Sequence, residues 1–203
     1  MQNEIQNYTH RGIDGCCFLY RCIVQLKHGV MDVAASNDKR ILITAFRNTS
    51  AELLVENCDQ YCVLLLPNHK TKDGEILCSA LTEKSFDYVF CIGQRPNIKN
   101  KVHIETTAKK SSESFTTKFN CAALAYKFAQ KGIPAKLSDH AGTSYCNALY
   151  FAGLSFAEAH ELETQVVFIH IPLRKNIDDF LSFRNRFFET IHDYIYERCT
   201  ENG

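Results

Sequence analysis

The sequence has no excess of charge of either sign. Its 203 residues include 23 Lys and Arg and 23 Asp and Glu, so the formal net charge is zero. A chain without net charge does not attract nucleic acid or anionic lipid over long range, so neither partner is expected. Hydrophobic residues make up 45% of the chain and charged residues 23%, which is typical of a soluble globular protein.

Export and membrane features are lacking as well. The most apolar N-terminal stretch, Cys16–Val24, is interrupted by Arg21 and preceded by Glu4 instead of a basic cluster. We therefore expect neither a signal peptide nor a membrane span. The ten cysteines are interpreted as reduced thiols of a cytoplasmic protein, most of them small core residues, because a disulfide framework needs a short exported chain.

Phosphate loops and strong metal motifs are absent. Neither G-x-G-x-x-G nor G-x-x-x-x-G-K-[ST] occurs, so nucleotide chemistry has no support and no cofactor is expected. No group of candidate metal ligands has the paired C-x-x-C or H-E-x-x-H spacing, and we predict no metal site. The groups considered are His103 with Glu105, Cys58 with Cys62, and His10 with Cys16, Cys17, Cys22 and His28.

The remaining pattern is typical of an α/β fold. From Arg40 onward, short apolar runs alternate with longer segments of helical period, which predicts a three-layer αβα sandwich with a twisted, mainly parallel central sheet. The expected strands are Ile41–Ala45, Tyr61–Leu66, Tyr88–Gly93, Val102–Thr107, Ala135–Ser138 and Val166–Ile171. The expected helices are Ser50–Asn57, Asp73–Lys84, Thr117–Lys131, Ser144–Ala157 and Ile177–Arg198.

The last helix has the clearest periodicity, and Asn176 is its expected N-cap. Its apolar stripe is interpreted as core packing and consists of Ile177, Phe180, Leu181, Phe187, Phe188, Ile191, Tyr194 and Ile195.

Residues 1–39 differ from the rest, being rich in Asn, Gln and His at the start and linker-like at Ala34–Asp38. We interpret 1–39 as an N-terminal extension and 40–203 as one domain. Met31 is the only other methionine, so translation starting there is a hypothesis that an intact-mass measurement would test.

Cys146 is the most informative residue. In IPAKLSDHAGTSYCNALY, residues 133–150, a short strand leads through a small-residue turn into a helix near Ser144. Cys146 would lie in the first turn, where free N–H groups and the helix dipole favour a thiolate and can stabilise an oxyanion. The position suits a nucleophile, with a buried structural thiol as the alternative.

Two further residues have chemistry that fits Cys146. His170 ends the apolar strand VVFIHIP, at the sheet edge where sites gather in α/β proteins, although such a histidine can also be a core residue. Glu105 lies in the strand VHIET, where a carboxylate needs a partner, and an imidazole is one such partner.

These segments resemble the pyroglutamyl peptidase I family. SDHAGTSYCNALY (138–150) is similar to the sequence around that family's nucleophile, and FIHIP (168–172) is similar to its histidine segment. VFCIGQR (89–95) resembles the strand and Gly-Gln turn before the family's acidic residue, and ILITAF (41–46) resembles its first strand. The resemblance runs in order from about residue 40 to the C-terminus.

The resemblance implies a cysteine peptidase domain that removes an N-terminal pyroglutamyl or related N-acyl group from peptides with a blocked N-terminus. It implies a triad in which Cys146 is the nucleophile, His170 the general base and acid, and Glu105 the residue that orients the imidazole. Members of the family often form homo-oligomers. The residues implied to bind the substrate are Phe46, Gly93, Gln94 and Tyr145.

The chain also departs from the family pattern. The loop after Phe46 lacks one of the family's two clamping aromatics, and Glu105 is not followed by the usual arginine and long polar excursion. A shorter segment predicts a more open site, where Arg47, Lys109 or Lys110 would favour an acidic group.

Three alternatives remain. Gly142–Cys146 resembles a G-x-S-x-G elbow with Ser144 as the nucleophile, but Cys146 replaces the final glycine. His140 is an alternative base by its proximity in sequence. The domain could also be an inactive binder of peptides or proteins.

Overall fold

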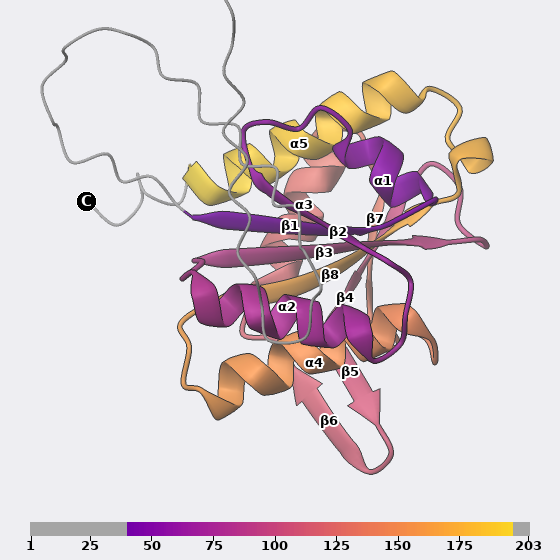
Figure 1. Cartoon of the computed structure of the whole chain (residues 1–203). Coiled ribbons are helices and arrows are strands. Elements are labelled where there is room, and N and C mark those ends of the chain that lie inside the picture. The colour runs from indigo at the N-terminus through magenta and orange to yellow at the C-terminus, as the bar shows by residue number, and fades with distance from the viewer. Residues whose placement is uncertain (1–39, 197–203) are drawn as a thin grey trace, which may run out of the picture.

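The computed structural model describes residues 40–196 of the 203, and these form a six-stranded sheet between two layers of helices (Figure 1). The strand order is β2-β1-β3-β8-β4-β7, and every pairing is parallel except β4 with β8. The predicted mainly parallel α/β sandwich is confirmed. The strands are β1 (Ile41–Phe46), β2 (Cys62–Leu66), β3 (Tyr88–Arg95), β4 (Val102–Glu105), β7 (Ala135–Ser138) and β8 (Gln165–Pro172).

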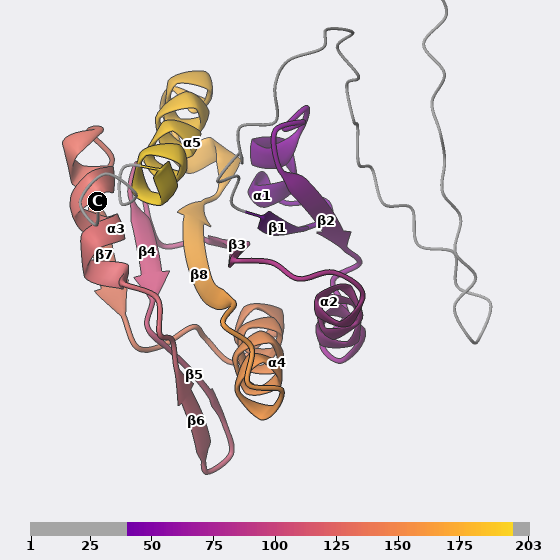
Figure 2. The ribbon, with the colours of Figure 1, turned by 90° about the vertical axis from the view of Figure 1, so that its left-hand side faces the viewer.

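The helices cover both faces of the sheet, as Figure 2 shows from the side. Strand residues alternate between two apolar clusters, because successive side chains of a strand point to opposite faces. Ile43 belongs to the cluster under α1, α3 and α5, whereas Leu42 belongs to the cluster under α2 and α4. The helices are α1 (Ser50–Val55), α2 (Lys72–Glu83), α3 (Cys121–Gln130), α4 (Tyr145–Ala159) and α5 (Phe180–Tyr196).

The start of α5 differs from its prediction. The helix begins at Phe180, and Asp179 Oδ1 accepts a hydrogen bond from the Ser182 N–H at 3.0 Å. Asn176 instead ends a short 3₁₀ turn (Arg174–Asn176), and its side chain donates to the carbonyl of Pro96 at 2.9 Å. The N-cap prediction at Asn176 is therefore wrong.

Most of the predicted apolar stripe of α5 is buried, including Phe187 and Ile191, but Leu181 is 66% exposed and does not belong to it. The predicted end at Arg198 lies outside the described residues, as do the extension 1–39, the Met31 hypothesis and the cysteine and histidine group at residues 10–28.

A small hairpin follows β4 and was not predicted. The expected strand Val102–Thr107 stops at Glu105, and the chain then forms β5 (Thr107–Lys110) and β6 (Glu113–Thr116), which project beyond the sheet beside α4 (Figure 1). The strands have four residues each and are largely exposed, so they show no apolar periodicity.

None of the helices described in 40–196 combines the length and apolar character that a membrane crossing requires.

Candidate active site

The antiparallel pairing of β4 with β8 brings Glu105 and His170 together. Glu105 is the register partner of Phe168, so its side chain lies on the same face of the sheet as that of His170, two residues further along β8. His170 Nδ1 donates to Glu105 Oε1 at 2.8 Å, and both side chains are buried. Because Nδ1 is engaged in this way, Nε2 is the ring nitrogen left for a reacting group.

Cys146 lies over the neighbouring strand. It occupies the first turn of α4, and its Sγ would come within 2.9 Å of a Cβ placed on Gly93. Gly93 is the register partner of His170, and adjacent strands lie about 4.8 Å apart. A glycine at position 93 therefore leaves the space that the sulfur of Cys146 occupies, one strand away from His170.

The surroundings of Cys146 favour its neutral thiol. Burial raises the pKa of Cys146 to about 12, and this effect outweighs the hydrogen bond from its own backbone N–H, which lowers the pKa. Cys146 forms no hydrogen bond with His170 in the described part of the chain. The expected thiolate at the helix N-terminus is thus opposed by desolvation.

Arg95 is a part of this cluster that the sequence did not indicate. It ends β3, and its Nη1 donates to Glu105 Oε1 at 3.2 Å, the same oxygen that accepts from His170. The same Nη1 lies 3.4 Å from His103 Nδ1. Burial is the largest cause of the lowered pKa of His103, followed by the Arg95 charge. Glu105 Oε2 is buried and has no hydrogen-bond partner among the described residues.

Two residues of α4 fix the helix against its surroundings. Tyr150, one turn after Cys146, donates its hydroxyl to the backbone carbonyl of Glu105 at 2.8 Å and is fully buried. The Asn147 side chain bonds both the N–H of Lys109, at 3.0 Å, and its carbonyl, at 2.6 Å, which attaches the hairpin to α4. These contacts fix the position of α4, which carries Cys146, relative to β4, which carries Glu105.

The sequence of this region is similar to that of known peptidases. The profile of the pyroglutamyl peptidase family matches residues 96–179, a range that includes Glu105, Cys146 and His170. The chain is 27% identical over 169 residues to the pyrrolidone-carboxylate peptidase of Brevibacillus brevis, a match that covers 66% of this chain and 78% of that one. It is also 27% identical over 122 residues to the Bacillus cereus pyrrolidone-carboxylate peptidase, covering 50% and 57%.

Solved structures share the fold. A mutant pyrrolidone carboxyl peptidase from Pyrococcus furiosus superposes with a TM-score of 0.66 at 17% identity, covering 78% of this chain and 99% of that one. Pyroglutamyl peptidase I from Bacillus amyloliquefaciens gives a TM-score of 0.64 at 18% identity, covering 73% and 91%.

The chain is therefore similar in sequence to the pyroglutamyl peptidase family and shares the fold of its solved members.

Three of the residues that the family resemblance assigns to substrate binding lie on β1 and β3, and the fourth, Tyr145, precedes Cys146 on α4. Phe46 ends β1 and is buried, Gly93 lies under the Cys146 sulfur, and Tyr145 begins α4 and is 46% exposed. The Gln94 side chain is occupied by the protein itself, because its Oε1 accepts from the N–H and the hydroxyl of Ser50 at 3.0 and 3.1 Å. Their substrate roles in this relative of the pyroglutamyl peptidases stay predictions.

Ser144 and His140, the alternative nucleophile and base, have no comparable partners within residues 40–196. Ser144 is the exposed N-cap of α4, and its side chain makes no capping hydrogen bond. His140 is exposed on the loop before α4, where its backbone bonds Ser138. Among residues 40–196, no group of three or more His, Cys, Asp or Glu side chains is arranged to hold a metal ion.

Proposed function

We propose that the protein is a cysteine peptidase that removes an N-terminal pyroglutamyl group from peptides. The observation that carries this proposal is the buried Glu105–His170 hydrogen bond one strand away from the Cys146 sulfur. A carboxylate that orients an imidazole beside a thiol is the arrangement that nucleophilic acyl transfer requires. The similarity to pyrrolidone-carboxylate peptidases supports the pyroglutamyl group as the acyl part of the substrate.

In the proposed reaction, the Cys146 sulfur attacks the pyroglutamyl carbonyl carbon while His170 Nε2 takes the thiol proton. Deprotonation occurs together with attack, because a pKa of about 12 keeps the resting thiol neutral. His170 then donates the proton to the leaving amine, and the peptide departs from a thioester on Cys146. Water, deprotonated by His170, hydrolyses the thioester and releases pyroglutamate with the thiol restored.

The first turn of α4 supplies donors for the oxyanion. The helical hydrogen bonds begin with the Ala148 N–H donating to the Ser144 carbonyl at 3.1 Å, so the backbone N–H groups of residues 145–147 make no bond within the helix. Such groups can stabilise the negative charge that develops on the carbonyl oxygen.

A substrate comparison tests this function. The purified full chain is expected to hydrolyse pyroglutamyl-naphthylamide, and to hydrolyse prolyl-naphthylamide and acetylalanyl-naphthylamide at least about tenfold more slowly, because a site built around the lactam rejects analogues that lack it. The release of naphthylamine gives kcat/KM for each compound. Cleavage of the acetylated compound alone would contradict the pyroglutamyl assignment.

A second candidate is peptide binding without hydrolysis. The raised pKa of Cys146 favours it, and so does Arg95, which shares the Glu105 oxygen with His170 and thereby weakens the carboxylate as a partner of the imidazole.

The pH dependence of alkylation distinguishes a Cys146 that is already a thiolate at neutral pH from one that is a neutral thiol. Since burial raises the pKa of Cys146 to about 12, the thiol stays protonated below that pH. The rate of iodoacetamide labelling at Cys146 is expected to rise by about tenfold per pH unit from pH 7 to 10 without a plateau, because only the thiolate reacts. Peptide mass mapping measures the rate, with Cys78, partly buried on α2, as the internal comparison. A plateau below pH 8 would show a thiolate paired with His170.

A further inference from the structure

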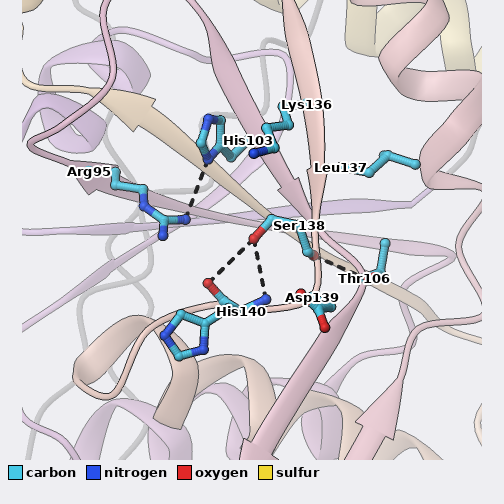
Figure 3. Close-up of a pocket in the computed structure, with 8 residues that line it drawn as sticks. All are labelled: Arg95, His103, Thr106, Lys136, Leu137, Ser138, Asp139 and His140. Carbon is cyan, nitrogen blue, oxygen red and sulfur yellow. Dashed lines mark hydrogen bonds between the residues drawn. The ribbon is translucent and has the colours of Figure 1, made fainter.

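A cleft opens beside the candidate site, on the side away from Cys146. Its volume is about 590 Å³, and its walls come from the end of β3, from β4, and from β7 with the loop that follows it (Figure 3). The charged and titratable side chains around it are Arg95, His103, Lys136, Asp139 and His140. It contains none of the residues assigned to the pyroglutamyl ring.

The register of the sheet shows how the cleft is placed relative to Cys146 and His170. One row of register partners crosses the sheet from β3 through β8 and β4 to β7. In that order, the row consists of Gly93, His170, His103 and Lys136. Cys146 stands over the Gly93 end, and the cleft surrounds the other end.

The direction of the substrate follows from the proposed chemistry. A general acid must lie next to the leaving nitrogen, so the leaving peptide emerges on the His170 side of Cys146. The pyroglutamyl ring then occupies the β1 and β3 side, and the leaving peptide passes toward the cleft at β4 and β7.

Among the cations of residues 40–196 that line the cleft, one has no acidic partner within that range. Arg95 is paired with Glu105 at 3.2 Å, and Asp139 is paired with Lys109 at 3.5 Å. Lys136 is exposed and forms no ion pair with an acidic residue of the described region. The free positive charge of Lys136 therefore faces the path of the leaving peptide.

His103 adds an unpartnered donor. An arginine can only donate, so Arg95 requires His103 Nδ1 to accept, and the neutral ring then has its hydrogen on Nε2. His103 Nε2 is buried and has no hydrogen-bond partner among residues 40–196. An unsatisfied N–H next to a free ammonium favours a ligand that brings acceptor oxygens and negative charge.

We propose that this cleft binds a carboxylate of the leaving peptide, with Lys136 as the residue that determines the preference. The carboxylate is either an Asp or Glu side chain directly after the pyroglutamyl group or the free C-terminus of a pyroglutamyl dipeptide. This assignment rests on the proposed function, because the position of His170 as general acid sets the direction of the leaving group.

Matched peptides test the proposal. The first pair, pyroglutamyl-Glu-Ala-amide and pyroglutamyl-Gln-Ala-amide, differs only in side-chain charge, and the second pair is pyroglutamyl-Ala with and without a C-terminal amide. Each is assayed for kcat/KM with wild-type protein and for Kd by calorimetry with the Cys146→Ala variant, so that binding is measured without turnover. Lys136→Met removes the charge. Lys118→Met is the matched control, since Lys118 is exposed and its neighbour Thr117 bonds Val166 at the opposite end of β8.

We expect the charged member of at least one pair to be preferred by about fivefold in kcat/KM and in Kd, as for an exposed ion pair with an added hydrogen bond. The preference should vanish in Lys136→Met, persist in Lys118→Met, and shrink when the ionic strength is raised about tenfold. The pair that shows it identifies the carboxylate as side chain or C-terminus.

Equal values within both pairs, or a preference that survives Lys136→Met, would overturn the cleft assignment. Cleavage of the Gln peptide would in that case still support the proposed function. If no peptide is cleaved, the proposed function fails, and the Kd ratios alone decide whether the cleft binds a carboxylate.

Discussion

Replacement of Cys146 by alanine is expected to lower kcat for pyroglutamyl-naphthylamide by at least about 10³-fold, because it removes the sulfur that we propose as the nucleophile. The fold should persist, since Cys146 is only partly buried and alanine is compatible with a helix first turn. The measurement is naphthylamine release under saturating substrate, with circular dichroism melting to verify folding.

A second cysteine provides the control for this prediction. Cys78 is partly buried on α2, and its sulfur reaches only a backbone carbonyl at 3.9 Å. Cys78→Ala should retain kcat within about twofold, as for a side chain that touches no reacting atom. If Cys146→Ala kept more than about a tenth of the wild-type activity, the nucleophile would have to be another group, with Ser144 the first to examine.

Most of the strands and helices were predictable because they pack apolar residues into the core in a regular pattern. The six strands of the sheet were found within about two residues, since buried strands of an α/β sheet are almost continuously apolar. The β5–β6 hairpin was missed because its strands are largely exposed, and they are held by Asn147 and by the ring contact of Phe115 with Phe151. Such tertiary contacts leave no local pattern.

The antiparallel direction of β4 relative to β8 could have been predicted from the sequence. The alternation of strands and helices suggested a parallel strand instead. β3 ends at Arg95 and β4 begins at Val102, a connection too short for a crossover between parallel strands, which needs a dozen or more residues. An antiparallel β4 follows from that length. This reversal is what places Glu105 beside Phe168 and within reach of His170.

The electrostatics of the candidate site could not be obtained from the sequence. Arg95 lies at the end of a strand, and nothing in its local sequence distinguishes it from a surface arginine. Only the three-dimensional structure shows that its guanidinium reaches Glu105 across β8. The helix N-terminus is visible in the sequence and favours a thiolate at Cys146, whereas the burial that raises its pKa depends on other elements, including β3 with Gly93 and β8 with Phe168.

Replacement of Glu105 by glutamine is expected to lower kcat by about 10³-fold with a smaller effect on KM. The amide nearly matches the carboxylate in shape, but it carries no charge to stabilise the imidazolium that forms in the proposed reaction, when His170 takes the thiol proton. Glu105 is fully buried, so no water replaces the missing charge. The Arg95 guanidinium also loses its ionic partner, and the free energy of unfolding should fall by about 1–3 kcal/mol.

Arg95→Met separates these two effects, because it removes the ion pair with Glu105 and leaves the Glu105–His170 hydrogen bond of 2.8 Å in place. We expect this variant to keep kcat within about tenfold of wild type, since a residue that acts through Glu105 is a positioning residue. Steady-state kinetics and urea unfolding of both variants distinguish the contributions. A Glu105→Gln protein with wild-type kcat, alongside a loss of activity in Arg95→Met, would transfer the electrostatic role from the carboxylate to the guanidinium. Loss of stability without loss of kcat in Glu105→Gln would reduce Glu105 to a structural partner of Arg95, and His170 would then act as the base without an orienting carboxylate.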